Sequence, residues 1–262
     1  MNKKIAYAGI GVLAAVIVII ATILQTASSG IASMDNVAVP ADTLAILREI
    51  SNNYTLANDI GMGIAQDLPV AVNRSTLLTI NGKPAVIYIG ADYCPNCAIL
   101  RWSLILALYR FGNFSSLHYM TSSAADAAPN SPTFTFFKSS YQSPYITFEG
   151  LELFNNKYPY TQLQELNSTE SAIFNSFDPS EYTPFVDFGN KTIQIGAEYT
   201  PMLIYKSNWS SVINELRIEN STIAQAIIGS ANVFTAQICS LINNTAPVCS
   251  EKFVKNLEKQ LA

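Results

Sequence analysis

Two cysteines separated by two residues are the part of the sequence best suited to chemistry. Cys94 and Cys97 enclose Pro95-Asn96. At this spacing on the first turn of a helix, both side chains lie on one face within reach of a disulfide. The unpaired N–H groups and the positive dipole at a helix N-terminus stabilise a thiolate, which favours Cys94. The pair therefore predicts a redox-active dithiol with Cys94 and Cys97 as its catalytic residues.

An apolar strand and an apolar helix must hold these cysteines in place. Ala85 to Ile89 is rich in β-forming residues, and Ala98 to Phe111 is apolar almost all round, so both elements are expected to be buried. Pro95 suits the first helical position, where no N–H partner is lost. Gly112-Asn113 is the expected helix stop. The cysteines thus lie where a strand becomes a helix.

A second informative segment lies far along the chain. Thr183-Pro184 precedes the apolar run Phe185 to Phe188, which a turn at Gly189-Asn190-Lys191 joins to Thr192 to Ile195. Together with Ala91-Asp92-Tyr93-Cys94, these segments resemble the thioredoxin-like fold. That fold is α/β, with a mixed sheet flanked by helices. Thr200-Pro201 is a rival for its cis-proline, but a helix rather than a hairpin follows it.

The resemblance also implies roles for individual residues. The Cys94 thiolate would attack a partner disulfide, and Cys97 would resolve the mixed disulfide. Pro184 would be in cis, and Thr183, Pro184 and Tyr93 would contact the substrate. The central Pro-Asn is more similar to the Pro-His and Pro-Tyr versions of the motif than to the Gly-Pro of thioredoxin, which implies an oxidase or isomerase.

One position departs from the resemblance. Thioredoxin-like reductases often have a buried carboxylate six residues before the first cysteine, and here that residue is Tyr88. Asp92 is closer in sequence and is expected to be exposed. A permanently closed, structural Cys94–Cys97 disulfide is therefore the alternative to a catalytic pair.

The segment between the two halves is long. Ser116 to Met120 predicts a second core strand, in which His118 is expected to be structural. Residues 124–182 exceed a simple crossover and predict a large insertion before the cis-proline strand, with a helix over Ser168 to Phe177. Aromatic residues are dense in the insertion and form either core or a substrate platform: Phe134, Phe136, Phe137, Tyr141, Tyr145 and Phe148.

Helices are expected on both sides of these segments. Asp42 is the expected N-cap of a helix ending at Ser51. Asn208 is the expected N-cap of Trp209 to Ile218, which suits the final helix of a thioredoxin-like unit. A long apolar helix follows over Ser221 to Asn243. We place the folded domain at 37–250 and an amphipathic C-terminal helix at 251–262.

The other two cysteines lie close together in sequence. Cys239 and Cys249 flank Asn243-Asn244 and Pro247, which indicate a helix end and a turn, so we predict a structural disulfide between them. A zinc site of all four cysteines is the alternative, but the second spacing does not suit it. We expect no metal and no cofactor.

The N-terminus predicts a membrane anchor. Two lysines in residues 1–4 precede Ile5 to Leu24, a run without charge that is long enough to cross a bilayer as a helix. Residues 1–4 would be cytoplasmic, residues 25–36 a flexible linker, and the remainder extracytoplasmic. The alternative is a signal peptide cleaved among the small residues that follow Leu24.

Composition and glycosylation sequons bear on partners and location. With 15 basic and 19 acidic residues and only 13% charged residues, the chain has no basic surface for nucleic acid, which we exclude as a partner. Sequons for N-glycosylation support an extracytoplasmic location. They are Asn53, Asn73, Asn113, Asn167, Asn190, Asn208, Asn220 and Asn243.

A more specific resemblance covers roughly residues 35 to 249. The resemblance rests on four short segments: residues 88–95, Arg101-Trp102, residues 110–114 and Ala231-Asn232. They resemble an archaeal family of membrane-anchored proteins, domain of unknown function 929. We expect a membrane-anchored extracytoplasmic thiol–disulfide oxidoreductase whose partners are exported proteins with cysteines or a membrane redox partner. The alternative is a non-catalytic glycosylated surface protein with structural disulfides.

Overall fold

The computed structural model describes residues 33–72 and 76–261 as an α/β domain with one mixed, six-stranded sheet. Strand β3 lies inside the sheet and pairs in parallel with β6 and antiparallel with β7 and β2. The path across the sheet is β1-β8-β7-β3-β2, with β6 beside β3. The strands are β1 (Val70–Ala71), β2 (Thr79–Ile80), β3 (Lys83–Gly90), β6 (Thr147–Glu152), β7 (Phe185–Phe188) and β8 (Thr192–Ile195).

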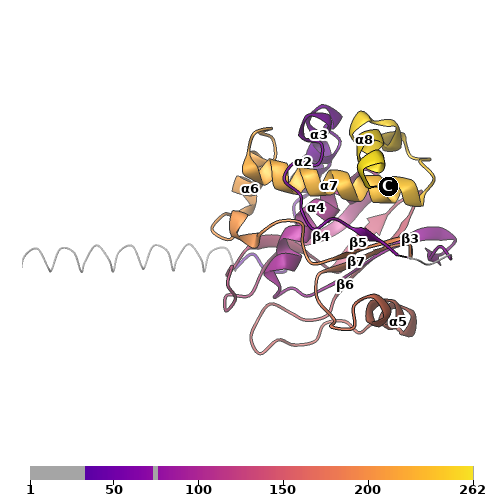
Figure 1. Ribbon diagram of the computed structural model, residues 1–262. Helices are drawn as coiled ribbons and strands as arrows, with labels where there is room; N and C mark the ends of the chain where they lie inside the picture. The colour runs from indigo at the N-terminus through magenta and orange to yellow at the C-terminus, as the bar shows by residue number, and fades with distance from the viewer. Residues whose placement is uncertain (1–32, 73–75, 262) are drawn as a thin grey trace, which may run out of the picture.

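Helices cover both faces of this sheet, as the apolar run of β3 requires (Figure 1). Val86 and Tyr88 belong to the core beneath α4 (Pro95–Tyr109) and α7 (Thr222–Leu241). Ala85, Ile87 and Ile89 point to the other face and pack with α5 (Ser168–Phe177). The strand and the buried helix around the cysteines were therefore predicted correctly.

A separate two-stranded sheet packs over α4. It consists of β4 (Asn113–Thr121) and β5 (Pro132–Gln142), which pair antiparallel. The Trp102 indole N–H donates to the Pro132 carbonyl at 2.8 Å, and the Thr133 hydroxyl donates to the Ala98 carbonyl at 2.6 Å. These bonds fix the hairpin on the helix that begins with the cysteines.

Two predictions in this region were wrong. Ser116 to Met120 does form a strand, but it belongs to the β4–β5 sheet and not to the central one. The neighbour of β3 is instead β6, which we had assigned to the insertion over 124–182. Of the predicted insertion, β6 belongs to the central sheet and α5 packs against that sheet. The segment between α4 and β6 that lies outside the central sheet is the β4–β5 hairpin.

The remaining helices lie near their predicted positions. Asn208 caps α6 as expected, since its side chain accepts the Ser211 N–H at 2.9 Å, but α7 rather than α6 makes the extensive contact with α4. Asp42 is not an N-cap: the helix begins after Pro40, and Asp42 lies in its first turn. The bounds are α2 (Ala41–Ser51), α3 (Tyr54–Ile60), η1 (Pro201–Leu203), α6 (Trp209–Glu215), η2 (Pro247–Ser250) and α8 (Lys252–Leu261).

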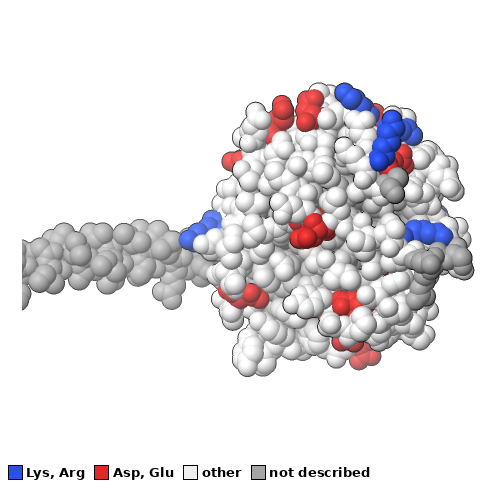
Figure 2. Space-filling view, in the orientation of Figure 1, with Lys and Arg blue, Asp and Glu red and all other residues white. Residues whose placement is uncertain are grey.

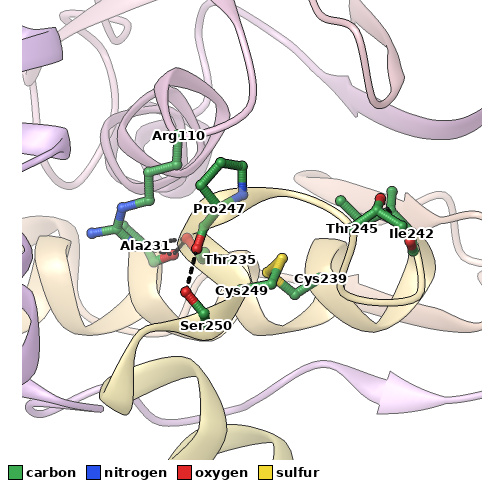
Figure 3. Close-up of a disulfide and its surroundings, with 9 residues drawn as sticks. All are labelled: Arg110, Ala231, Thr235, Cys239, Ile242, Thr245, Pro247, Cys249 and Ser250. Atoms are coloured by element: carbon green, nitrogen blue, oxygen red, sulfur yellow. Dashed lines mark hydrogen bonds between the residues drawn. A yellow bond between two sulfur atoms is a disulfide. The ribbon is translucent and has the colours of Figure 1, made fainter.

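The predicted Cys239–Cys249 disulfide is present and ties the last turns of α7 to η2 (Figure 3). On the same helix, Ala231 and Thr235 accept hydrogen bonds from Arg110, which comes from the end of α4. The four-cysteine zinc alternative is excluded because two of the sulfurs are bonded to each other. Helix α7 is long and apolar enough to span a bilayer, but 78% of its apolar window is buried, which places it in the core.

The chain enters the domain along strand β4. Asn36 N–H donates to the Tyr119 carbonyl at 2.8 Å, and Ala38 forms an isolated bridge with His118. The flexible linker predicted over 25–36 is therefore wrong at its end, because Asp35 and Asn36 are bonded to the domain. The predicted membrane anchor at 5–24 lies outside the described residues.

Candidate active site

The two cysteines occupy the N-terminus of α4, as predicted. Cys94 is the N-cap residue and Pro95 the first helical residue. The Cys97 N–H donates to the Cys94 sulfur at 3.1 Å, and the Cys94 thiol donates to the Thr183 carbonyl at 3.6 Å. Both cysteines are free thiols. The Thr183–Pro184 bond is cis. The contact between Cys94 and Thr183 joins the cysteines to this segment, and Tyr93 packs against both cysteines, so the fold brings together the five residues predicted for the site.

The environment separates the acidities of the two thiols. A hydrogen bond from Cys97 lowers the pKa of Cys94 most, and the Cys97 backbone N–H and the Arg101 charge lower it further, against the effect of burial. Burial raises the pKa of Cys97 well above its usual value, and the neighbouring Cys94 adds to this. Cys94 is thus suited to be the nucleophile, and Cys97 stays protonated until it reacts.

A buried ion pair lies directly behind the cysteines. From α4, Arg101 donates through Nε and Nη2 to the two carboxylate oxygens of Glu152 at 2.8 and 2.6 Å. Its Nη2 also donates to the Ala91 carbonyl at 2.7 Å, and Asp92 Oδ1 lies 3.7 Å from the same atom. All three charged side chains are almost completely shielded from solvent. The site therefore contains a fixed guanidinium with two carboxyl groups.

The expectation that Asp92 is exposed was wrong. Its side chain is only 1% exposed, and burial together with the nearby Glu152 raises its pKa to about 7. Tyr88 occupies the position six residues before Cys94, where thioredoxin-like reductases often have a carboxylate. Its buried hydroxyl lies over Gly90, and a Cβ added at Gly90 would be 2.0 Å from that hydroxyl oxygen. The carboxyl groups near the cysteines come instead from the loop before Cys94 and from the end of β6.

Tyr93, the fifth predicted site residue, takes part in a surface aromatic cluster. Its ring stacks on Tyr160 at a centroid distance of 4.3 Å and lies 6.4 Å from the ring of Phe154. The aromatic residues that we had considered as a platform lie elsewhere. Phe134 and Phe136 are buried, and Tyr141, Tyr145 and Phe148 pack against the same core, so the core interpretation holds for them.

The predicted sequons differ in accessibility. Asn190 is half-buried. Asn73 lies outside the described residues. The side chains of Asn53, Asn167 and Asn208 cap helices through their oxygen, which leaves the amide nitrogen free for a glycan. The exposed sequons are Asn53, Asn113, Asn167, Asn208, Asn220 and Asn243.

Sequence comparison places the protein in a family. A family model described as a domain of unknown function, DUF929, matches residues 70–240, about two-thirds of the chain. The chain belongs to the DUF929 family. The matched range includes Cys94, Cys97, Arg101, Glu152 and Pro184. No curated protein and no solved structure matches the sequence.

Glu152 is the site residue that sequence reasoning missed. It lies 51 residues after Arg101, in a stretch that we had assigned to an insertion. A signal was nevertheless present in α4, because Arg101 is the charged residue within a mostly apolar helix and a buried guanidinium requires a partner. Among the described residues, the carboxylate that meets this requirement is Glu152.

Proposed function

We propose that this DUF929 protein is a membrane-anchored, extracytoplasmic thiol–disulfide oxidoreductase of the oxidase or isomerase type. The contact of the Cys94 sulfur with both the Cys97 N–H and the Thr183 carbonyl carries this proposal. It brings the sulfur of a helix N-cap beside the strand that would receive an extended substrate. Tyr93 and Pro184 would form further parts of the substrate surface.

A thioredoxin-like fold is part of the proposal. The strand order β8-β7-β3 with β6 parallel to β3, and with β7 and β8 antiparallel, supports it. So does the placement of α4 and α7 on one face of the sheet and α5 on the other. The β4–β5 hairpin then becomes the insertion in this fold, located between α4 and β6.

The chemistry would proceed in the oxidising direction from a Cys94–Cys97 disulfide. A substrate thiolate attacks the Cys94 sulfur, and Cys97 leaves and takes up a proton. A second substrate thiolate then attacks the substrate sulfur of the mixed disulfide and releases the Cys94 thiolate. Two electrons pass from the substrate to the enzyme, and an exported disulfide or membrane redox partner reoxidises Cys94 and Cys97. The lowered pKa of Cys94 favours this direction because it makes Cys94 a good leaving group.

The test uses the full chain in detergent with a reduced peptide that contains two cysteines. We expect the oxidised parent protein to form the peptide disulfide and Cys94→Ser to form none. Cys97→Ser, given the peptide in its disulfide form, should accumulate a mixed disulfide, because the Cys94 thiolate attacks the peptide disulfide and no Cys97 is present to resolve the product. Equal peptide oxidation by the parent and Cys94→Ser would overturn the proposal.

The reduction potential of the Cys94–Cys97 pair supplies an independent test. A value of about −120 to −180 mV is expected for a disulfide donor. A potential below about −300 mV would identify a structural disulfide and favour a glycosylated surface protein that uses the fold as a scaffold. The exposed sequons are the observation that keeps this second function under consideration.

A further inference from the structure

A projecting loop after β6 presents aromatic rings beside the candidate active site. Its two arms are joined by a bridge between Phe154 and Gln162 and by a hydrogen bond from the Asn155 N–H to the Thr161 carbonyl at 2.9 Å. The Asn155 side chain also accepts the N–H groups of Lys157 and Thr161. Hydrogen bonds within the loop, from its backbone and from the Asn155 side chain, therefore hold its two arms together.

The rings form a continuous series from the loop tip to the cysteine motif. Tyr158, at the tip, is 80% exposed, and its ring lies 5.8 Å from that of Tyr160. Tyr160 stacks on Tyr93, which directly precedes Cys94. Phe154 is also exposed and lies beside Tyr93. We name Tyr93, Phe154, Tyr158 and Tyr160 the aromatic ridge.

The chain enters the folded domain at the base of this ridge. The Asn156 side-chain amide donates to Asp35 Oδ2 at 2.7 Å and to the Thr121 carbonyl at 2.9 Å. Asp35 also accepts the Thr121 N–H at 2.8 Å through its other oxygen. Tyr158, at the loop tip, is thus only two residues from Asn156, which is hydrogen-bonded to Asp35 in the N-terminal segment.

Chain length limits how far this point can be from a membrane anchor. Only the residues from Gln25 to Met34 separate the apolar run 5–24 from Asp35. Such a segment spans at most about 35 Å when fully extended. A domain of about 230 residues is roughly 45 Å across, so Asp35 and the base of the ridge cannot lie on the side of the domain farthest from the bilayer.

The chemistry of the ridge fits a lipid interface. Tyrosine has an apolar ring with a polar tip and is favoured at the level of lipid headgroups. Lys157, next to Tyr158, is exposed and can meet lipid phosphates. Charged side chains are otherwise sparse and scattered on the face shown in Figure 2.

We propose that the tip of the aromatic ridge rests on the bilayer in which residues 5–24 are anchored. This inference depends on the membrane-anchored part of the proposed function. It places Cys94, at the other end of the ridge, close to the membrane surface. Its redox partners would then be membrane proteins or exported chains at that surface, and not proteins in free solution.

The test measures tryptophan quenching in the full chain reconstituted into phosphatidylcholine nanodiscs, with or without bromine near the headgroup end of the acyl chains. Tyr158→Trp is the probe, because the native Trp102 and Trp209 are both buried. Val70→Trp is the matched control: Val70 is 57% exposed, and β1 lies at the opposite edge of the sheet from β6.

We expect bromine to remove more than half of the additional emission of Tyr158→Trp and almost none of that of Val70→Trp. In discs that contain phosphatidylglycerol, adding Lys157→Glu to Tyr158→Trp should reduce the quenching. Equal and weak quenching of both tryptophan variants would overturn the inference and leave the ridge as a protein-docking surface. A chain that does not co-elute with the discs would overturn it as well.

These outcomes are separable from the proposed chemistry. Quenching does not require a reactive sulfur, so it should be unchanged in a chain that also contains Cys94→Ser. Peptide oxidation in detergent, in turn, does not require the bilayer. Quenching without thiol exchange would therefore refute only the oxidoreductase, and thiol exchange without quenching would refute only the bilayer contact.

Discussion

Two buried arginines on α4 show how the surroundings of a residue determine its role. Arg101 meets the carboxylates of Glu152 and Asp92 behind the cysteines. Arg110, the C-cap of the same helix, donates to the Ser51 carbonyl and the Thr235 hydroxyl and lies over the Phe253 ring. Burial without a carboxylate lowers the pKa of Arg110 to about 10. Arg101 is close enough to the cysteines for its charge to lower the pKa of Cys94.

This difference predicts distinct effects for Arg101→Gln and Arg110→Gln. Both are expected to lower the unfolding free energy by about 3 kcal/mol or more, because each leaves buried partners unpaired. Only Arg101→Gln should raise the pKa of Cys94, since it removes a positive charge that lowers this pKa. The measurement is the rate of Cys94 alkylation against pH. The same profile for Arg101→Gln and the parent would contradict a role for the guanidinium in stabilising the thiolate.

At this scale the sequence identified residues whose chemistry is local. Cys94, Cys97 and the helix N-terminus lie in one short segment, so spacing alone predicted their geometry. The Cys239–Cys249 disulfide was predictable for the same reason. The burial of Asp92 and its proximity to Glu152 depend on the pairing of β3 with β6. These two strands are far apart in the sequence, so the residue pattern around Asp92 could not predict its burial.

Helix α7 is held very close to α3 and to the segment that follows it. The Asn232 side-chain amide donates to the Ala57 and Gly61 carbonyls at 2.9 and 2.7 Å. One turn earlier, a Cβ added at Gly229 would lie 2.3 Å from the Met62 carbonyl oxygen. Glycine at this helical position therefore permits a close backbone contact, at the expense of helix propensity.

Gly229→Ala is expected to destabilise the protein by about 1–3 kcal/mol, because the added methyl group overlaps backbone that cannot easily move. Ser230→Ala is the matched control in the next position. Its hydroxyl is buried without a partner, so its removal should leave stability unchanged or slightly higher. Urea unfolding of the two variants measures both effects. Equal stability of Gly229→Ala and the parent would show that the helix can shift away.

Elements with strong local signals were found at their predicted places. The helix Ser168–Phe177 agrees to the residue, since its Asn167 and Glu170 form a capping box. The assignment of strands to sheets was less successful. β4 and β6 are both plausible core strands in sequence, and only tertiary packing decides that β6 pairs with β3.

The molecule contains several buried or partly buried carboxyl groups whose pKa is raised by burial. The Glu198 carboxylate is completely buried, and its pKa is about 8. The pKa of Asp92 is about 7, and those of Asp35, Glu149 and Glu152 are also raised. Such groups bind protons more tightly in the folded state than in the unfolded chain, where a glutamate titrates at about 4.3. Their contribution to stability is therefore complete in acid and is lost as the pH rises.

We expect the unfolding free energy to fall between about pH 4.5 and pH 8, by about 1.4 kcal/mol per pH unit for each group that would be ionised only in the unfolded chain. Urea unfolding across this range measures the slope. Glu198→Gln should reduce it and be more stable than the parent at pH 7.5, with little difference at pH 4. A stability that increases toward pH 8 would contradict the prediction.

The Arg101–Glu152 pair has a further consequence for how the sheet assembles. Glu152 is the last residue of β6 and lies opposite Gly90, with its side chain on the α4 face. A shift of β6 by one residue would turn Glu152 toward α5 and place a neighbouring side chain against the guanidinium. The misaligned sheet would then contain an unpaired charge on each face, at a cost of several kcal/mol. The ion pair behind the cysteines thus also selects the register in which β3 and β6 meet.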